Sequence, residues 1–345
     1  MHTKKRKHTG RRITIALILV LALLAALVWG FYQSKLNLLI FDDGVQEIDT
    51  QTKLPLDDLE LPDMGDAYDR ESKLPTGDAV TDKDVVNILL LGTDDRSTKY
   101  SENARADAIM LLSLNLRTHK IKLVSIERGI GVPIPGRNDD WLTHTFRYGG
   151  AALTMQTVQD CFKVDVSRYI RVNFHAFREG IDAIGGVDIT LTQAEADYLN
   201  HRRTQEGYDL QPVTAGLNHL DGNTALEYAR ARKLDSDWKR IERQRNVIQA
   251  ALNQVASADL LTLNKLLDTI LPTIRTNLTK NEITQLLLEI PGFLAEGLQI
   301  EQMTIPTEDT CWNSVGVDGR KLIAVDFEAN AKILQDFFYE GELND

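Results

Sequence analysis

A run of twenty residues without a charged side chain, ITIALILVLALLAALVWGFY at positions 13–32, constrains this chain more than any other feature. As a helix that rises about 1.5 Å per residue, it would be roughly 30 Å long, which is the thickness of the hydrocarbon core of a bilayer. Trp29, Phe31 and Tyr32 stand at its end, where aromatic side chains favour the membrane interface. The sequence therefore predicts a single transmembrane anchor at residues 13–32.

The residues before this run set its orientation. Residues 1–12 contain six Lys/Arg and no acidic residue, and positively charged flanks stay on the cytoplasmic side of a membrane. We therefore expect residues 1–12 to be a cytoplasmic tail and the chain after residue 32 to be extracytoplasmic. The alternative is a cleaved signal peptide, whose apolar region is about 7–15 residues and ends at a small-residue cleavage site. This run is longer and lacks such a site.

Residues 33–84 differ in composition from the rest of the chain. Positions 42–84 carry fourteen Asp/Glu against four Lys/Arg, include three prolines and show no sustained helical or strand period. Low hydrophobicity with high net charge is typical of segments that do not fold alone. A flexible coil of this length would span roughly 35 Å, from about 5–6 Å × √n. We expect residues 33–84 to be a solvated extracytoplasmic linker that tethers the next domain without fixing it.

From residue 85 the pattern becomes globular. Apolar runs of strand length occur at 87–92, 108–115, 120–126, 169–174, 187–191 and 298–306, and helical periods separate them. Alternating strands and helices predict one α/β domain at 85–345, a sandwich with a central mixed sheet.

The cysteines and histidines indicate no zinc site, because their spacing fits no common ligand pattern. Cys161 and Cys311 are the only cysteines. An extracytoplasmic location permits a disulfide between them. The sequence does not place them in contact, and we favour two separate thiols.

Charged residues gather at the junction of the first two predicted strands, in GTDDRSTKYSENARADAIML at 92–111, and four of them are candidate site residues. Asp94 and Arg96 follow the first strand, and Arg105 and Asp107 precede the second. If these strand ends meet, both carboxylates face one point, and two carboxylates with waters and phosphate oxygens are ligands that Mg²⁺ prefers. The alternative is a solvated loop whose local ion pairs contribute little.

A further arginine, Arg128 in SIERG, stands at the carboxyl end of the predicted strand 120–126. Ligands of α/β proteins collect outside such strand ends. An arginine that merely ends a strand at the surface explains the pattern equally well.

Five arginines gather in YARARKLDSDWKRIERQR at 228–245, although the chain has a net charge of −11. Asp237 can cap a helix on which Arg240 and Gln244 share a face, and Arg230 and Arg232 approach from the preceding turn. The alternative is a solvated face on which nearby acidic residues pair with these arginines. Nucleic-acid binding is disfavoured by the acidic charge and the predicted location.

Taken in order, these segments resemble the LytR-CpsA-Psr (LCP) family. The runs that carry the resemblance are NILLLGTDDR, RADAIMLLSLN, KLVSIER, YGGAALTMQTVQD, YIRVNFHAFREGIDAIGGVDITL, GLNHLDGNTALEYARARK and RIERQRNVIQA. They keep the family's order over nearly all of residues 85–250. The resemblance implies an α-β-α sandwich with an apolar pocket for a prenyl chain, which the sequence alone does not locate.

The resemblance also implies an activity. Such proteins transfer a glycopolymer (a teichoic acid, a capsule or another secondary wall glycan) from a polyprenyl pyrophosphate to peptidoglycan through a phosphodiester link. Asp94 and Asp107 would hold Mg²⁺, which Mn²⁺ can replace. Arg128 would stabilise charge in catalysis, and either Asp107 or Asp237 would be the base. The pyrophosphate would be bound by Arg96, Arg105, Arg128, Arg230, Arg232, Arg240 and Gln244.

The chain departs from the family at the SIPRD pattern, where Glu127 replaces proline and Gly129 replaces aspartate. Loss of that aspartate can weaken the orientation of Arg128. Two other functions therefore stay open: hydrolysis of polyprenyl pyrophosphates at the same site, and a non-catalytic role in binding the lipid carrier or in regulation. The sequence does not indicate an oligomeric state.

Overall fold

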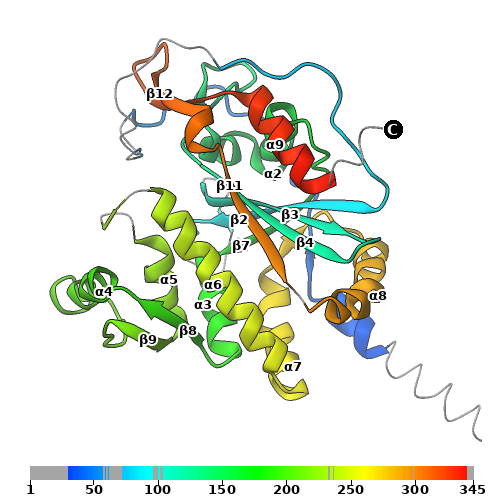
Figure 1. Cartoon of the computed structure of the whole chain (residues 1–345), viewed down its shortest axis with the longest axis vertical. Helices are drawn as coiled ribbons and strands as arrows, with labels where there is room; N and C mark the ends of the chain where they lie inside the picture. The colour runs from blue at the N-terminus through cyan, green and yellow to red at the C-terminus, as the bar shows by residue number, and fades with distance from the viewer. Residues whose placement is uncertain are drawn as a thin grey trace, which may run out of the picture.

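A seven-stranded mixed sheet forms the centre of the computed structural model (Figure 1). The structure describes residues 30–56, 59, 61, 72–95, 100–101, 104–231, 234–235, 237–297 and 299–339. Three neighbouring pairs of strands are parallel and three are antiparallel, so the predicted mixed sheet is confirmed. In spatial order the strands are β1 (Ile40–Phe41), β10 (Arg275–Thr276), β7 (Arg168–Asn173), β2 (Val85–Thr93), β3 (Ala106–Asn115), β4 (Lys120–Ile126) and β11 (Ile300–Ile305).

Helices cover both faces of the sheet, which is the α-β-α arrangement expected from the family resemblance (Figure 1). Side chains alternate along β3: Ile109 and Leu111 join the core that also contains Phe146 and Val158, whereas Ala108 and Met110 face the other side. The first face carries α2 (Leu142–Phe162) and α9 (Phe327–Tyr339). The second carries α3 (Phe174–Ala183), α5 (Gly222–Arg230), α6 (Asp237–Ser257) and α7 (Leu260–Ile270).

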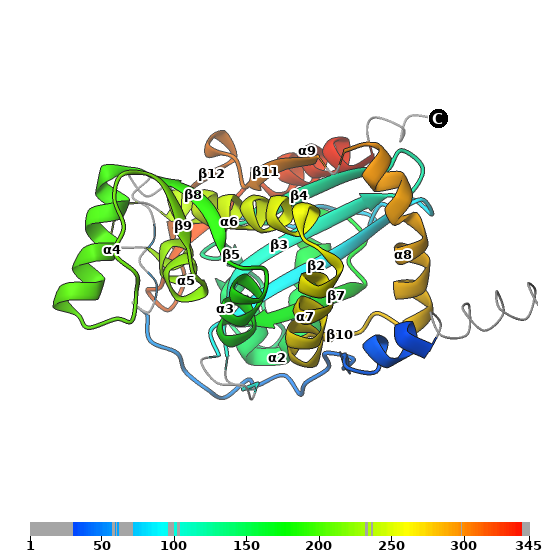
Figure 2. The same cartoon turned by 90° about the horizontal axis from the view of Figure 1, so that it is seen from below.

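Smaller elements extend this sandwich. A lobe of α4 (Gln193–Gln205) and the hairpin of β8 (Val187–Leu191) and β9 (Gly216–Leu220) has its own core with α5, and Figure 2 shows it at one end of the molecule. Capping boxes begin α4 at Thr192 and α8 (Lys280–Ala295) at Thr279. The remaining elements are β5 (Gly131–Val132), β6 (Asp140–Trp141), β12 (Cys311–Val315), β13 (Lys321–Val325) and the 3₁₀ turns η1 (Leu271–Thr273) and η2 (Glu308–Thr310).

The segment 40–56 contacts the domain at several points, so these residues do not form the free coil expected from the sequence, although most of their side chains are at least partly exposed. Its strand β1 pairs with β10 at the edge of the sheet. Arg137 donates to the carbonyl oxygens of Asp49 and Thr52, and Arg320 donates to those of Leu54 and Pro55. Backbone groups make these contacts, so a count of acidic side chains does not reveal them. Figure 2 shows the segment as a blue trace along the molecule.

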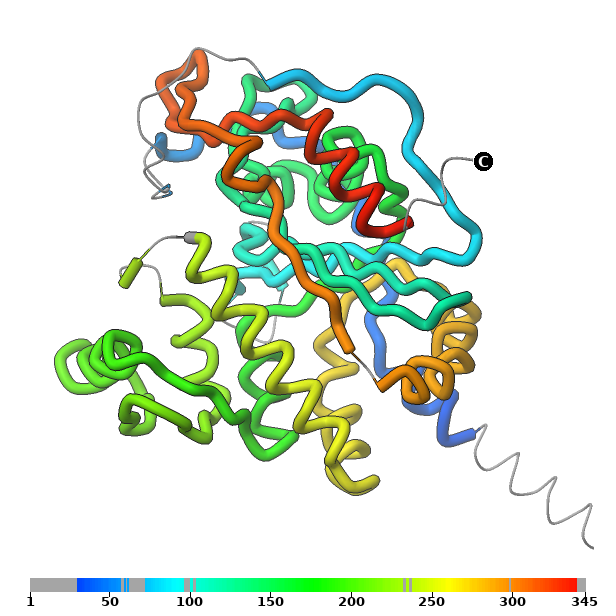
Figure 3. Tube along the Cα trace, in the orientation of Figure 1, coloured from blue at the N-terminus to red at the C-terminus, as the bar shows by residue number. Residues whose placement is uncertain are grey.

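Residues 72–84 also follow the domain before they enter β2, as the blue to cyan tube in Figure 3 shows. Val80 pairs with Val164 beyond the end of α2. The predicted extracytoplasmic position of residues 33–84 stays a prediction.

The predicted tail at 1–12 and most of the predicted anchor at 13–32 lie outside the described residues. Residues 30–36 form a helix. Within the described ranges, no helix is both long and apolar enough to cross a membrane.

Cys161 and Cys311 are both buried thiols that no disulfide joins, as we favoured from the sequence. Burial raises the pKa of the Cys311 thiol to about 11, so the thiol stays protonated at neutral pH.

The packing of segment 40–56 predicts that Arg320→Ala strongly destabilises the protein. Arg320 is 3% exposed, its Nε lies 2.9 Å from Asp140 Oδ1, and its guanidinium stacks 4.6 Å from the centre of the Trp141 ring. Alanine would leave the buried Asp140 carboxylate without this cation, and breaking such a pair costs about 3–5 kcal/mol. Urea denaturation of the full chain measures the loss in the free energy of unfolding.

The matched control is Arg117→Ala. The Arg117 side chain is 46% exposed and lies 3.5 Å from Asp82 and 3.8 Å from Asp84, so its loss should cost less than about 1 kcal/mol. Equal losses for the two variants would contradict the role given to Arg320.

Candidate active site

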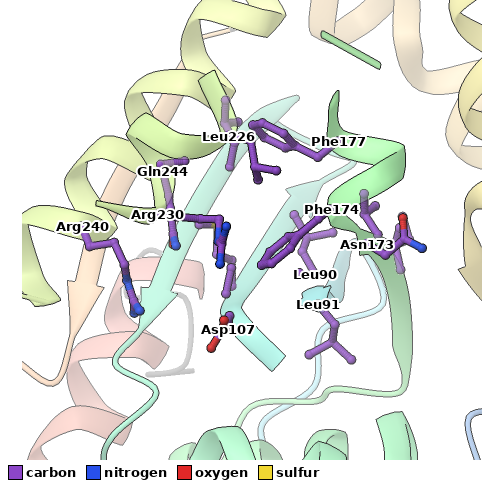
Figure 4. Close-up of a pocket in the computed structure, with 17 residues that line it drawn as sticks. Leu90, Leu91, Asp107, Asn173, Phe174, Phe177, Leu226, Arg230, Arg240 and Gln244 are labelled. Carbon is purple, nitrogen blue, oxygen red and sulfur yellow. The ribbon is translucent and has the colours of Figure 1, made fainter. Parts of the chain in front are cut away.

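A pocket of about 250 Å³ opens between the sheet and the helices α3, α5 and α6 (Figure 4). Most of its wall is apolar. Leu90, Met110 and Ile170 come from three neighbouring strands, and Phe177 and Ile248 come from the helices above them. The lining residues are Leu90, Leu91, Gly92, Asp107, Ala108, Met110, Ile170, Val172, Asn173, Phe174, Phe177, Leu226, Ala229, Arg230, Arg240, Gln244 and Ile248.

Small residues keep the pocket open. Gly92 in β2 pairs with Ala108 in β3, and both lie on the face that the pocket exposes. A methyl group added at Gly92 would lie 3.0 Å from the Ala108 Cβ. Larger residues at this pair would therefore fill the space between the sheet and the helices.

Polar side chains that the sequence singled out meet at one end of this pocket. Asp107, Arg230, Arg240 and Gln244 all line it, and Figure 4 shows both arginines on the Asp107 side, away from Phe177. On α6, Arg240, Gln244 and Ile248 follow one another at intervals of four residues and so share one face. This face changes from charged to apolar along the helix.

Arg230 ends α5 and is held from two sides. Its guanidinium lies 4.4 Å from the centre of the Phe174 ring, and its Nη1 lies 3.7 Å from Glu227 Oε2. Glu227 is buried and accepts hydrogen bonds from Arg202 Nε at 2.7 Å and Tyr198 Oη at 3.2 Å. The sequence analysis missed this support, because α4 contributes Tyr198 and Arg202 from more than twenty positions before Glu227.

Arg128 lies just beyond β4, as predicted, and its side chain is buried against Asp107. Its Nη1 donates to Asp107 Oδ1 at 2.5 Å, and its carbonyl oxygen accepts from the Thr143 amide at 3.0 Å. The Asp107 carboxylate thus orients Arg128 although the family's aspartate is missing. This ion pair joins the ends of β3 and β4 at the polar end of the pocket.

The two residues that depart from the family pattern have structural roles. Glu127 is buried, and its Oε1 accepts a hydrogen bond from the Gly129 amide at 3.0 Å. A Cβ at Gly129 would lie 2.3 Å from Leu61 Cδ2 and 3.2 Å from Leu59 Cδ2. The close approach of these leucines therefore favours glycine where the family has aspartate.

The ends of β2 and β3 meet, as the sequence predicted. Asp94 Oδ1 accepts from the Arg105 amide at 2.9 Å, and Arg105 Nε lies 3.5 Å from Asp94 Oδ2. The pairing of β2 with β3 shifts between Gly92 and Thr93, so that Asp107 is the extra residue. Asp94 and Asp107 therefore stand at the same edge of the sheet.

This edge has the donor chemistry for a magnesium ion. Across the part of the chain that the structure describes, no three His, Cys, Asp or Glu residues form a group that could hold a metal ion. Mg²⁺, however, commonly takes only one or two carboxylates and completes its shell with waters and substrate phosphates. Asp94 and Asp107 fit that pattern.

Three predicted site residues are not located by the structure. Arg96 and Arg232 lie outside the described residues, and the side chain of Asp237, the first residue of α6, is also outside them. Their predicted roles stay predictions.

Two of the five arginines at 228–245 stabilise the fold. Arg243 is buried and donates to both carboxylate oxygens of Asp235, at 2.5 and 2.9 Å, and to the Ala231 carbonyl oxygen at 2.8 Å. Arg245 Nη1 donates to Thr304 Oγ1 in β11 at 2.7 Å. The solvated-face alternative is therefore wrong for Arg243, although its pairing with an acidic neighbour is present.

Known proteins are similar to this chain in sequence and in fold. The polyisoprenyl-teichoic acid–peptidoglycan teichoic acid transferase TagU of Oceanobacillus iheyensis is 36% identical over 276 residues, which cover 76% of this chain and 82% of that protein. The TagU of Halalkalibacterium halodurans is 30% identical over 260 residues, or 74% of this chain and 81% of that protein.

Among solved structures, "TagT bound to LI-WTA" superposes with a TM-score of 0.60 at 26% identity and covers 80% of this chain and 100% of that one. The sequence model of the LytR_cpsA_psr family matches residues 59–335. The chain is therefore a member of the LytR_cpsA_psr family.

Proposed function

We propose that this protein transfers a glycopolymer from a polyprenyl-pyrophosphate carrier to peptidoglycan and forms a phosphodiester link. The observation that carries the proposal is a single pocket that is apolar over most of its wall and charged at one end, with Arg230, Arg240 and Asp107. A polyprenyl pyrophosphate has the same division between hydrocarbon and charge. Because the relatives are named for teichoic acid transfer, a teichoic acid is the first glycan to test.

The arginines suit the charge of this substrate. Guanidinium groups bind phosphate oxygens through two parallel hydrogen bonds and keep their charge, whereas lysine offers a point charge. In the transfer, a peptidoglycan hydroxyl oxygen attacks the phosphorus that bears the glycan, and the bond from that phosphorus to the polyprenyl phosphate breaks. Negative charge grows on the leaving phosphate, where Arg230 and Arg240, with Arg128 beside Asp107, can stabilise it.

The proton of the attacking hydroxyl needs an acceptor. The two candidates for this acceptor are Asp107, which lines the pocket, and Asp237. A carboxylate that binds a metal ion is a weaker base, so Asp237 is the alternative acceptor when Asp107 serves as a metal ligand.

We further propose that Asp94 and Asp107 hold Mg²⁺, for which Mn²⁺ can substitute. When bound, the ion would neutralise charge on the pyrophosphate oxygens. Arg105 holds the Asp94 carboxylate in place through its amide and its guanidinium.

The proposed substrates indicate the cellular location of the protein. Polyprenyl-linked wall polymers and peptidoglycan meet outside the cytoplasmic membrane, which agrees with a single-pass anchor at 13–32 and a cytoplasmic tail at 1–12. We propose this location for the protein, with residues 33–345 extracytoplasmic. The acidic net charge of −11 gives no support to nucleic-acid binding.

Replacement of Arg230 by alanine should remove transfer but leave the fold intact. The side chain is partly exposed at the end of α5, and loss of one preorganised donor typically lowers the rate about 10²–10³-fold. Mass spectrometry of a mixture of the full chain, a polyprenyl-pyrophosphate-linked sugar, peptidoglycan fragments and Mg²⁺ measures the phosphodiester-linked product.

Lys239→Ala is the matched control, because Lys239 is an exposed cation on α6 whose described ion pair is with Glu242. Near-normal transfer by Arg230→Ala would contradict the proposed phosphate contact. Free phosphorylated sugar without linked product from the wild type would favour hydrolysis.

A chelator should abolish transfer by the wild type, and either Mg²⁺ or Mn²⁺ should restore it. Asp94→Asn removes one anionic oxygen ligand, so that variant should need a higher metal concentration for half-maximal transfer. Titration of Mn²⁺ followed by electron paramagnetic resonance reports the affinity without turnover. Transfer that is insensitive to the chelator would refute the metal proposal.

Enlargement of Ala108 should shorten the prenyl chain that the pocket accepts. Ala108→Leu places additional carbon atoms between Gly92 and the helices, and overpacking of roughly 1–3 kcal/mol would weaken binding of a long chain about tenfold or more. A two-isoprene donor should lose less. Equilibrium binding of donors of both lengths measures the difference, with Ala194→Leu on the exposed side of α4 as control. Equal binding by both variants would argue against this pocket as the prenyl site.

A further inference from the structure

Large apolar side chains are exposed at one end of the molecule. Leu260 and Leu261 at the start of α7 are 83% and 82% exposed, and Leu288 in α8 is 73% exposed. Leu294 in α8 and Phe31 in the helix 30–36 are also exposed. Exposed apolar side chains that gather on neighbouring elements commonly mark an interaction site. We call the exposed side of α7, α8 and the helix 30–36 the apolar face.

The helix 30–36 is fixed to α7 and α8. Lys35 Nζ lies 2.5 Å from Asp268 Oδ1 in α7, and Tyr32 Oη lies 2.5 Å from Thr284 Oγ1 in α8. Lys280 at the start of α8 donates to Asn37 at 2.5 Å. Figure 1 shows this helix, in blue, beside α8 at the end of the molecule that carries α7. The first described residues of this helix, Gly30, Phe31 and Tyr32, are the last three of the uncharged run that begins at Ile13.

If residues 13–32 span the membrane, as we propose, the bilayer surface must therefore lie beside α7 and α8. The anchor holds the apolar face at a constant short distance from the same bilayer, which gives lipid a very high effective concentration there.

The pocket supplies an independent argument. Its volume of about 250 Å³ is at or below the range of roughly 300–1,000 Å³ that encloses a drug-sized ligand. A long polyprenyl chain is larger than such a ligand, so the part of the chain that extends beyond the pocket would be accommodated best by lipid. An apolar end that opens close to the bilayer would allow this.

The direction of α6 shows toward which part of the molecule the apolar end of the pocket lies. The pocket-facing residues change from Arg240 to Ile248 along α6, and α6 continues to Ser257, just before α7 begins at Leu260. The apolar part of the pocket therefore lies on the side toward α7. Close packing of α7 against α3 keeps it there, since a Cβ at Gly180 would lie 3.2 Å from Ile270 Cδ1.

We propose that the apolar face rests in the outer surface of the lipid bilayer and turns the apolar end of the pocket toward it. The proposal rests on the anchored transferase proposed above. Transfer of leucine side chains from water to the boundary between lipid headgroups and acyl chains is favourable, and it would stabilise this orientation. Lys35 and Lys280 already contact Asp268 and Asn37, so we expect binding through apolar contact with little dependence on lipid charge.

A test of depth uses the full chain in phosphatidylcholine vesicles. Single cysteines at Leu261, Leu288 and Val317 would carry a polarity-sensitive fluorophore, and the buried Cys161 and Cys311 should give little background. Val317 is the matched control, because it is 88% exposed but lies between β12 and β13. We expect a blue shift at 261 and 288 and quenching by lipids with brominated acyl chains, but no change at 317.

Three equally water-exposed labels would overturn the proposal. A blue shift at 261 and 288 without acyl-chain quenching, with dimers in sedimentation, would also overturn it and would assign the apolar face to a second copy of the chain. None of these readings depends on turnover, so they stand even where transfer fails.

A second test separates the apolar face from the active site. In the double variant Leu261→Asp/Leu288→Asp, transfer from a full-length polyprenyl donor in vesicles should fall about tenfold or more, since two charges replace apolar groups at the lipid boundary. Transfer from a short, water-soluble donor should not change. The control is Leu217→Asp/Val317→Asp, at exposed apolar positions on other elements.

An equal loss with both donors would overturn the membrane role of these leucines. Wild-type protein that transfers from neither donor would instead refute the proposed transferase.

Discussion

The ion pair between Asp107 and the buried Arg128 is the interaction on which the geometry of the site depends. A charge removed from water is tolerated only with a partner and further hydrogen bonds, and here the partners come from the ends of two neighbouring strands. Thr143 ties the start of α2 to the same point, since its Oγ1 donates to the Ala106 carbonyl and its amide to the Arg128 carbonyl. The ion pair and the two hydrogen bonds of Thr143 therefore join β3, β4 and α2 at one point. The polar end of the pocket is consequently part of the rigid sandwich, and its charges are in place before a substrate binds.

The arginines of this acidic chain have different structural roles. Arg243 and Arg320 donate to backbone carbonyl oxygens and contact carboxylates, so their charge is balanced inside the fold. Arg230 differs, because it is partly exposed, stacks on Phe174 and meets Glu227 only at 3.7 Å. That carboxylate is itself engaged at shorter distance by Arg202. Arg230 can therefore turn to a phosphate at small cost, whereas Arg243 and Arg320 cannot leave their partners without destabilising the protein.

The sequence predicted what depends on local pattern and missed what depends on distant contacts. Apolar runs identified the strands, and the ends of those strands identified Asp94, Asp107 and Arg128. The amino-acid composition of residues 40–56 does not predict their contacts with the domain. Composition describes side chains, whereas Arg137 and Arg320 bind the backbone carbonyl oxygens of this segment. The support of Arg230 by Tyr198 and Arg202 was invisible, because it needs the fold of α4 onto α5. The pocket had no signal either, since Leu90, Met110 and Ile248 have the pattern of ordinary core residues.

The same reasoning explains why a pocket can persist inside a well-packed sandwich. A hydrophobic interior normally closes on itself, because an empty space forfeits contacts on every side. Here the small residues Gly92 and Ala108 leave space above the sheet. At the polar end, the charged groups of Arg240 and Arg128 are already buried, and covering them with apolar side chains would desolvate them further. The space between these constraints suits a ligand that is itself divided into hydrocarbon and charge. A carrier lipid has this form, and the membrane contact proposed for α7 and α8 would turn the apolar side of the pocket toward lipid.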